Sequence, residues 1–129
     1  MPNKKILLVD DDDQFVDMLQ KTLTRSGYST LRARNGREAL QLYDPGKISL
    51  VLTDLLMPDV EGIELILELA RRRDGIKIIA MSGGGNAPEA NLRAAQYLGA
   101  AMTLSKPFST EQLFSSIQTV LGEKAPQRD

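Results

Sequence analysis

Short, mostly apolar segments alternate along this chain with segments whose apolar residues recur at helical spacing, and this alternation constrains the fold most strongly. The predicted strands are residues 5–9, 28–33, 48–53, 76–81 and 100–105. The predicted helices are residues 13–25, 36–43, 61–73, 88–98 and 109–121. Strands that alternate with helices run parallel, and continuous apolar strands indicate a sheet covered on both faces. The sequence therefore predicts an open, doubly wound α/β sheet of five parallel strands, with the more polar second strand at an edge.

Local signals mark where two helices end or begin and which side of a helix faces the core. Gly27 stands where a C-cap glycine would end the first helix, and Ser109 and Gln112 form a capping box for the last one. In the first helix we expect the core-facing residues to be Phe15, Met18, Leu19, Thr22 and Leu23. In the third helix we expect them to be Ile63, Ile66, Leu67 and Ala70. One domain over residues 1–122, followed by a polar tail at 123–129, accounts for the chain of 129 residues.

The composition excludes several classes of function. The chain has no Cys and no His, so thiolate metal sites, imidazole metal sites and a Ser-His-Asp triad are impossible. Its 16 basic and 17 acidic residues give a net charge of −1, which provides no bulk attraction to nucleic acid or to an anionic membrane. No apolar run approaches the roughly 20 residues of a membrane span. We therefore expect a cytoplasmic protein that binds neither nucleic acid nor membrane.

Four consecutive aspartates, Asp10 to Asp13, follow the first predicted strand. Like charges this close raise one another's pKa and oppose folding unless a positive charge relieves them. A hard divalent cation such as Mg²⁺, which prefers oxygen ligands, is suited to that position. One or two of the four can instead cap the following helix, where acidic side chains favour the positive end of the helix dipole.

Other polar side chains follow the remaining buried strands at the same predicted edge. Asp54 comes after the third strand, Ser82 after the fourth and Lys106 after the fifth. Ligands of open parallel sheets bind at the carboxyl ends of the strands, so these groups should meet there. Carboxylates can hold Mg²⁺, while a hydroxyl and an ammonium can contact phosphate oxygens. One carboxylate can then act as the nucleophile toward phosphorus. Because the chain has no His, a phosphoryl group carried on imidazole must arrive from another protein.

These segments, which span about residues 4–121, resemble the CheY-like receiver domains of response regulators. The resemblance rests on the run Ile6 to Asp11, on Asp54 with Met57, Pro58 and Gly62, on Ser82, and on Lys106 to Phe108. It implies a flavodoxin-like fold with strand order 2-1-3-4-5. It also implies a protein of two-component signal transduction.

The resemblance assigns the acidic residues to two groups. It makes Asp54 the phospho-acceptor, and it makes Asp11 and Asp54 direct Mg²⁺ ligands together with the backbone carbonyl of Leu56. It implies that Asp10 holds the ion through water. Asp12 and Asp13 lie beyond the matched pair, and we interpret them as residues of the helix start.

The resemblance also implies roles for the groups at the fourth and fifth strands. Ser82 is the switch hydroxyl, and Lys106 contacts the acceptor carboxylate and then the phosphoryl group. A cis peptide bond is implied between Lys106 and Pro107. The chain departs from the family at Thr103, where an aromatic switch residue is usual, and at Leu56, where a polar residue is usual. We expect the apolar Leu56 to hinder the water that hydrolyses the phosphoryl group.

The resemblance thus implies a receiver that accepts a phosphoryl group on Asp54 from a histidine kinase or a phosphotransfer protein and then switches a surface that binds an output protein. Such a domain catalyses its own phosphorylation and dephosphorylation but is not a turnover enzyme. A phosphorylation-independent pseudo-receiver would be expected to lack Asp54, Asp11 or Lys106, and all three are present. Phosphohydrolases of the haloacid-dehalogenase type also use an aspartyl nucleophile, but they need a second acid two residues later, where Leu56 stands. The chain can be a stand-alone receiver or a fragment of a transcription regulator or hybrid kinase.

Overall fold

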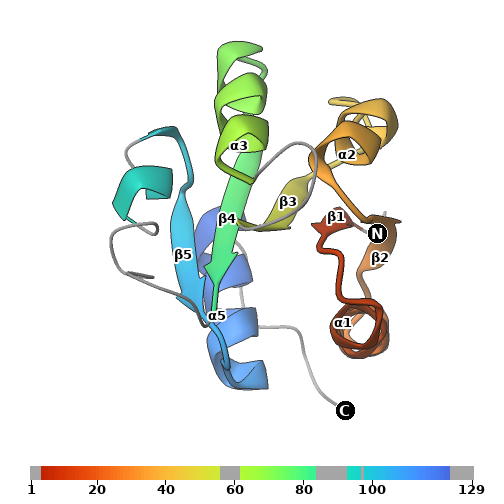
Figure 1. Ribbon diagram of the computed structural model, residues 1–129. Helices are drawn as coiled ribbons and strands as arrows, with labels where there is room; N and C mark the ends of the chain where they lie inside the picture. Colours follow the sequence, from red (N-terminus) through yellow and green to blue (C-terminus); the bar gives the residue numbers. More distant parts are fainter. Residues whose placement is uncertain (1–3, 56–61, 84–92, 97, 123–129) are drawn as a thin grey trace.

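One parallel sheet forms the centre of the protein. The computed structural model describes residues 4–55, 62–83, 93–96 and 98–122, and within them the strand order is β2-β1-β3-β4-β5. All four neighbouring pairs run parallel. The strands are β1 (Lys5–Val9), β2 (Ser29–Ala33), β3 (Leu50–Asp54), β4 (Lys77–Ser82) and β5 (Met102–Ser105). The predicted fold, the strand order and the edge position of the polar second strand are confirmed (Figure 1).

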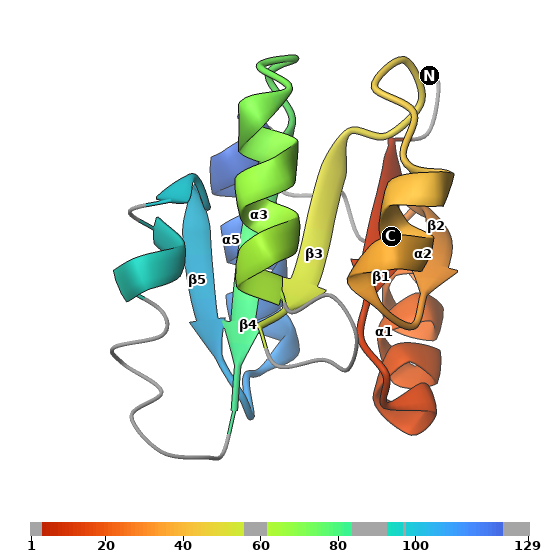
Figure 2. The ribbon, with the colours of Figure 1, turned by 45° about the horizontal axis from the view of Figure 1, so that its top comes forward.

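Helices cover both faces of this sheet. They are α1 (Asp13–Arg25), α2 (Gly36–Leu42), α3 (Gly62–Arg71) and α5 (Thr110–Leu121). In Figure 2, α2 and α3 lie in front of the sheet, and α1 and α5 lie behind it. Residues 93–96 and 98 of the predicted helix 88–98 are helical, whereas its beginning lies outside the described residues, as does the tail 123–129. No helix in the described part of the chain is long and apolar enough to cross a membrane.

The side chains of the strands alternate between two separate apolar clusters, one under each pair of helices. On β1, Leu7 and Val9 belong to the cluster with α2 and α3, whereas Ile6 and Leu8 belong to the cluster with α1 and α5. This two-sided burial follows from the period of two in a strand, and it explains why β1 is apolar at every position from Ile6 to Val9. The central strands are therefore packed against apolar clusters on both faces, and their carboxyl ends lie at one edge of the sheet.

Two sequence predictions about helix faces were wrong in part. Met18 is 51% exposed and Leu67 is 42% exposed, and Ala70 is also exposed. The buried stripe of α1 is instead formed by Val16, Leu19 and Leu23, and that of α3 by Gly62, Leu65, Ile66 and Leu69. Both helices carry apolar residues over a wider arc than the sheet covers, so periodicity alone could not select the stripe that makes contact.

The helix-end signals are confirmed. Ser26 caps the C-terminus of α1 and is followed by Gly27 in a left-handed conformation (φ 96°), which glycine adopts without a Cβ penalty. At the start of α5, the Ser109 hydroxyl accepts a hydrogen bond from the Gln112 amide (3.0 Å). The Gln112 side chain accepts one in return from the Ser109 amide (2.8 Å). Local capping therefore sets these boundaries as the sequence predicted.

Candidate functional site

Three carboxylates meet at the carboxyl edge of the sheet. Oxygen atoms of Asp10, Asp11 and Asp54 all lie within 4.8 Å of one another. The pairing of Val9 with Thr53 in the β1–β3 ladder brings Asp10 beside Asp54, because each acid is the next residue along its strand. Asp10 is 3% exposed and Asp54 is 9% exposed, whereas Asp11 is exposed. Two buried acids and one exposed acid therefore share one site.

The ammonium of Lys106 lies between the two buried acids. Its Nζ is 2.7 Å from Asp10 Oδ2 and 3.7 Å from Asp54 Oδ1. The resemblance led us to expect contact with Asp54, and the structure adds a shorter ion pair with Asp10. The backbone amide of Lys106 donates to the carbonyl of Ser82 (2.7 Å), which joins the ends of β4 and β5. The peptide bond between Lys106 and Pro107 is cis, as the resemblance implied.

The electrostatics of the site centre on Asp54. Burial raises the pKa of Asp54 to about 6; Lys106 lowers it, and the neighbouring charges of Asp10 and Asp11 raise it further. The attraction of Lys106 thus does not offset the burial of Asp54 and the charges of its two acidic neighbours. A hard divalent cation would supply the missing positive charge, and the carboxylate oxygens are the ligands that Mg²⁺ takes. The donor set therefore fits Mg²⁺. The Leu56 carbonyl lies outside the described residues, so its role stays a prediction.

Ser82 ends β4 beside this cluster and is 1% exposed. Among the described residues, its hydroxyl oxygen has no hydrogen-bond partner. A buried hydroxyl without a partner is destabilising, and in a native protein such a group calls for an explanation. A phosphate oxygen that enters the site would provide that partner.

Two glycines permit the close packing of the site. A Cβ on Gly62 would lie 2.1 Å from the Asp54 carbonyl oxygen, so only glycine lets the start of α3 approach the end of β3. A Cβ on Gly83 would lie 2.4 Å from Cβ of Lys106. The sequence pattern identified Gly62 through the resemblance, but the role of Gly83 as the residue beside the lysine stem was missed.

Sequence reasoning also missed the role of Phe15, which it assigned to the core. The Lys106 ammonium lies 4.2 Å from the centroid of the Phe15 ring. The only signal in the sequence was the position of Phe15 within the first turn after the acidic run, which was too weak to indicate a contact with Lys106.

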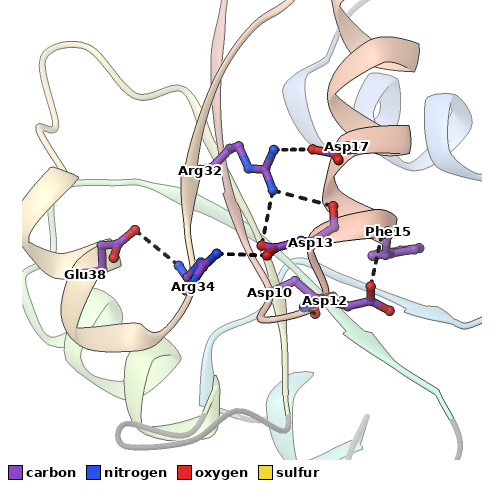
Figure 3. A network of polar contacts seen from close by, with 8 residues as sticks. All are labelled: Asp10, Asp12, Asp13, Phe15, Asp17, Arg32, Arg34 and Glu38. Carbon is purple, nitrogen blue, oxygen red and sulfur yellow. Dashed lines mark hydrogen bonds and ion pairs between the residues drawn. The ribbon is translucent and has the colours of Figure 1, made fainter.

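Asp12 and Asp13 belong to the helix start, as predicted, and not to the carboxylate cluster. Asp12 is the N-cap of α1, and its side chain accepts a hydrogen bond from the Phe15 amide (3.2 Å). Asp13 forms ion pairs with Arg34 (2.8 Å) and Arg32 (3.4 Å), and Arg32 also pairs with Asp17 (Figure 3). These two arginines are therefore neutralised by acids and do not form a basic patch.

The chain matches known proteins along most of its length. Residues 6–118 match the response regulator receiver domain. Sporulation initiation phosphotransferase F of Bacillus subtilis is 30% identical over 125 residues, which cover 97% of this chain and 99% of that protein. Transcriptional regulatory protein GlrR of Escherichia coli is 34% identical over 124 residues, which cover 96% of this chain. The chain spans only 28% of the length of GlrR.

Solved structures agree with the sequence matches. The CheY-like receiver domain protein of Methanospirillum hungatei superposes with a TM-score of 0.85 at 30% identity, covering 94% of this chain and 95% of that one. A receiver domain protein of Clostridium thermocellum superposes with a TM-score of 0.86 at 25% identity, covering 92% and 94% respectively. From the sequence match, the superposed fold and the residues gathered at the sheet edge, we conclude that the chain belongs to the response regulator receiver domain family.

Proposed function

We propose that Asp54 accepts a phosphoryl group from a phosphohistidine on a histidine kinase or a phosphotransfer protein, and that the site binds Mg²⁺. One observation carries this proposal. The oxygens of Asp10, Asp11 and Asp54 lie within 4.8 Å of one another, and Lys106 Nζ lies 3.7 Å from the carboxylate of Asp54. A nucleophilic carboxylate, two further cation ligands and a fixed ammonium are the groups that such a transfer needs.

The chemistry that we propose is a direct displacement at phosphorus. An oxygen of Asp54 forms a bond to phosphorus while the bond between phosphorus and the donor imidazole nitrogen breaks. The imidazole nitrogen keeps the electron pair and takes up a proton, and Asp54 becomes an acyl phosphate. Lys106 can donate to a phosphoryl oxygen from its place beside Asp54, and the unpartnered Ser82 hydroxyl can donate to another.

In this proposal, Asp11, Asp54 and the Leu56 carbonyl would hold the cation directly, and Asp10 would hold it through water. When bound, Mg²⁺ would neutralise the clustered carboxylates and stabilise the negative charge that develops on the transferred group. The chain's own residues supply the nucleophile and the groups that orient the phosphoryl group. Asp54 supplies the nucleophile, while Lys106 and Ser82 orient the phosphoryl oxygens.

The result of the transfer in this proposal is a switch and not a turnover reaction. A hydrogen bond from Ser82 to the phosphoryl group would draw the end of β4 toward Asp54 and shift the populations of two states of the adjoining surface. An output protein would bind one of these two states better than the other. Sporulation initiation phosphotransferase F, which the chain matches over 99% of its length, is named a phosphotransferase, and this supports onward transfer to a second protein as one form of output.

The test is incubation of the protein with acetyl phosphate and Mg²⁺, followed by mass spectrometry of the intact chain. We expect a mass gain of one phosphoryl group that is lost in Asp54→Ala and after chelation of Mg²⁺. Asp13→Asn is the matched control because it removes an acid from the same run outside the cluster, and it should label like wild type. Labelling that persists in Asp54→Ala, or no labelling at all, would contradict the proposal.

A further inference from the structure

The Lys106 ammonium is in contact with three groups, and one of them is aromatic. Asp10 lies at 2.7 Å and Asp54 at 3.7 Å, and the centroid of the Phe15 ring lies at 4.2 Å. At that distance the negative face of an aromatic ring attracts a cation, and the attraction grows when the pair is shielded from water. The Lys106 side chain is only 21% exposed, so solvent weakens the attraction between the ammonium and the ring only in part.

The Phe15 ring is itself fixed by its surroundings. Phe108 packs against it edge to face, with the ring centroids 5.9 Å apart and an interplanar angle of 80°, which is a favoured geometry for aromatic pairs. Phe108 lies two residues after Lys106, so the segment that carries the lysine also carries the ring that supports Phe15. The backbone of Phe15 is held as well, because its amide donates to the Asp12 side chain (3.2 Å).

These contacts form a continuous series that begins and ends at Asp10. The Asp12 amide donates to Asp10 Oδ1 (3.0 Å), Asp12 caps the helix that begins with Asp13 and carries Phe15, and Phe15 lies against Lys106. Lys106 then pairs with the other oxygen of Asp10. The acidic run thus contributes twice to the site, once as carboxylates and once by fixing the position of the Phe15 ring.

We propose that Phe15 is a positioning residue that holds the Lys106 ammonium between Asp10 and Asp54. Without the ring, the lysine head would sample solvent and contact Asp54 for a smaller fraction of time. The effect of this placement on phosphoryl transfer rests on the function proposed above, whereas the placement itself does not. The alternative is that Phe15 only fills space at the start of α1.

The first test is the proton NMR spectrum of the Lys106 ε-methylene group in the protein without phosphodonor. A lysine held over a ring face has these protons displaced upfield by the ring current. We expect the displacement in wild type and in Phe15→Tyr, and its loss in Phe15→Leu. Phe114→Leu makes the same substitution in the core beneath α5, and it should leave the upfield displacement of the Lys106 protons unchanged. A wild-type shift equal to that of the exposed Lys21 would overturn the inference.

The second test is a double-mutant cycle on unfolding in urea. Phe15→Leu should raise the unfolding equilibrium constant in both the wild-type and the Lys106→Met backgrounds. The increase should be about fivefold larger in the wild-type background, because Lys106→Met has already removed the contact between the cation and the ring. Equal effects in the two backgrounds would mean that Phe15 acts by packing alone, and the inference would be wrong.

The third test connects the placement to function. The rate of Asp54 phosphorylation by acetyl phosphate should fall about fivefold in Phe15→Leu and recover in Phe15→Tyr, since tyrosine restores the ring. An unchanged rate in Phe15→Leu would overturn the functional part of the inference. If the wild-type protein does not react at all, the proposed function fails, and the NMR and unfolding measurements still decide whether Phe15 positions Lys106.

Discussion

The two ends of the acidic run make ion pairs of nearly equal length in different surroundings. Asp10 pairs with Lys106 at 2.7 Å and its side chain is 2% exposed, whereas Asp13 pairs with Arg34 at 2.8 Å and its side chain is 51% exposed. The Coulomb attraction between charges grows as the effective dielectric constant falls, and so does the cost of leaving a charge unpaired. Burial, rather than distance, therefore separates the two pairs in energy.

Aspartate has a different role at each end of this run. At the buried end, three carboxylates gather beside one ammonium that pairs with Asp10 and Asp54, and the excess of negative charge suits the site to a divalent cation. At the exposed end, Asp13 and Asp17 are matched by Arg32 and Arg34, and the pairs connect α1 to β2 and to the residue just after it. Because the charges of this surface network are balanced, it has no excess charge with which to bind a cation.

Removal of Lys106 should have the largest effect on stability. Lys106→Met leaves Asp10 and Asp54 buried without their cation, so we expect the free energy of unfolding to fall by about 2–4 kcal/mol at neutral pH without Mg²⁺. Arg34→Met at the exposed end should cost less than about 1 kcal/mol. Urea denaturation of both variants measures the difference. Equal losses would show that burial does not distinguish the two pairs.

Mg²⁺ should stabilise the buried end only. At a concentration about 100 times the dissociation constant, binding to the folded state adds about 2.7 kcal/mol to the free energy of unfolding. We expect this gain in wild type and in Asp13→Asn, and a much smaller gain in Asp54→Asn. Urea denaturation with and without Mg²⁺ measures the gain. A full gain in Asp54→Asn would place the cation away from the carboxylate cluster.

The raised pKa of Asp54 predicts a pH dependence of stability in the absence of Mg²⁺. The unfolded chain has an aspartate pKa of about 3.9, whereas the folded protein holds the pKa of Asp54 at about 6. Between these values the folded state binds more protons, so the contribution of Asp54 to stability is present below about pH 4 and is lost as the pH rises to about 6.

The comparison of wild type with Asp54→Asn isolates this contribution. The variant has no carboxylate to desolvate, so it should gain on the order of 1–3 kcal/mol relative to wild type between pH 4 and pH 7. Urea titrations at several pH values provide the measurement, and Asp13→Asn serves as the control. A difference that does not change with pH would mean that Asp54 ionises as easily in the fold as in water.

The smallest effect is expected at the surface network. Asp13→Asn removes the partner of Arg34 and one partner of Arg32, and the free energy of unfolding should fall by about 0.2–1 kcal/mol at low salt. At about 1 M salt, where charges are screened beyond about 3 Å, most of this loss should disappear. Thermal or urea unfolding at both ionic strengths tests it. A loss that persists at high salt would assign Asp13 a role beyond these ion pairs.

The sheet, the order of its elements and the edge at which the site lies all follow from patterns along the sequence. Apolar strands joined by helices must run parallel, and parallel strands present their carboxyl ends together. The alternation therefore placed Asp10, Asp54, Ser82 and Lys106 at one edge, while the capping box at Ser109 depended only on neighbouring residues. Such features rest on local chemistry and on connectivity, both of which can be read along the chain.

The atoms that meet at that edge depend on how the elements pack on one another. Differences of about an ångström between residues far apart in sequence set three contacts at the site. These are the short ion pair of Lys106 with Asp10, the Phe15 ring over the ammonium, and Gly83 beside the Lys106 side chain. The choice of Val16 over Met18 for the buried stripe of α1 is of the same kind. Periodicity places a residue on a helix or strand, but the packing of one element on another sets its contacts and its burial.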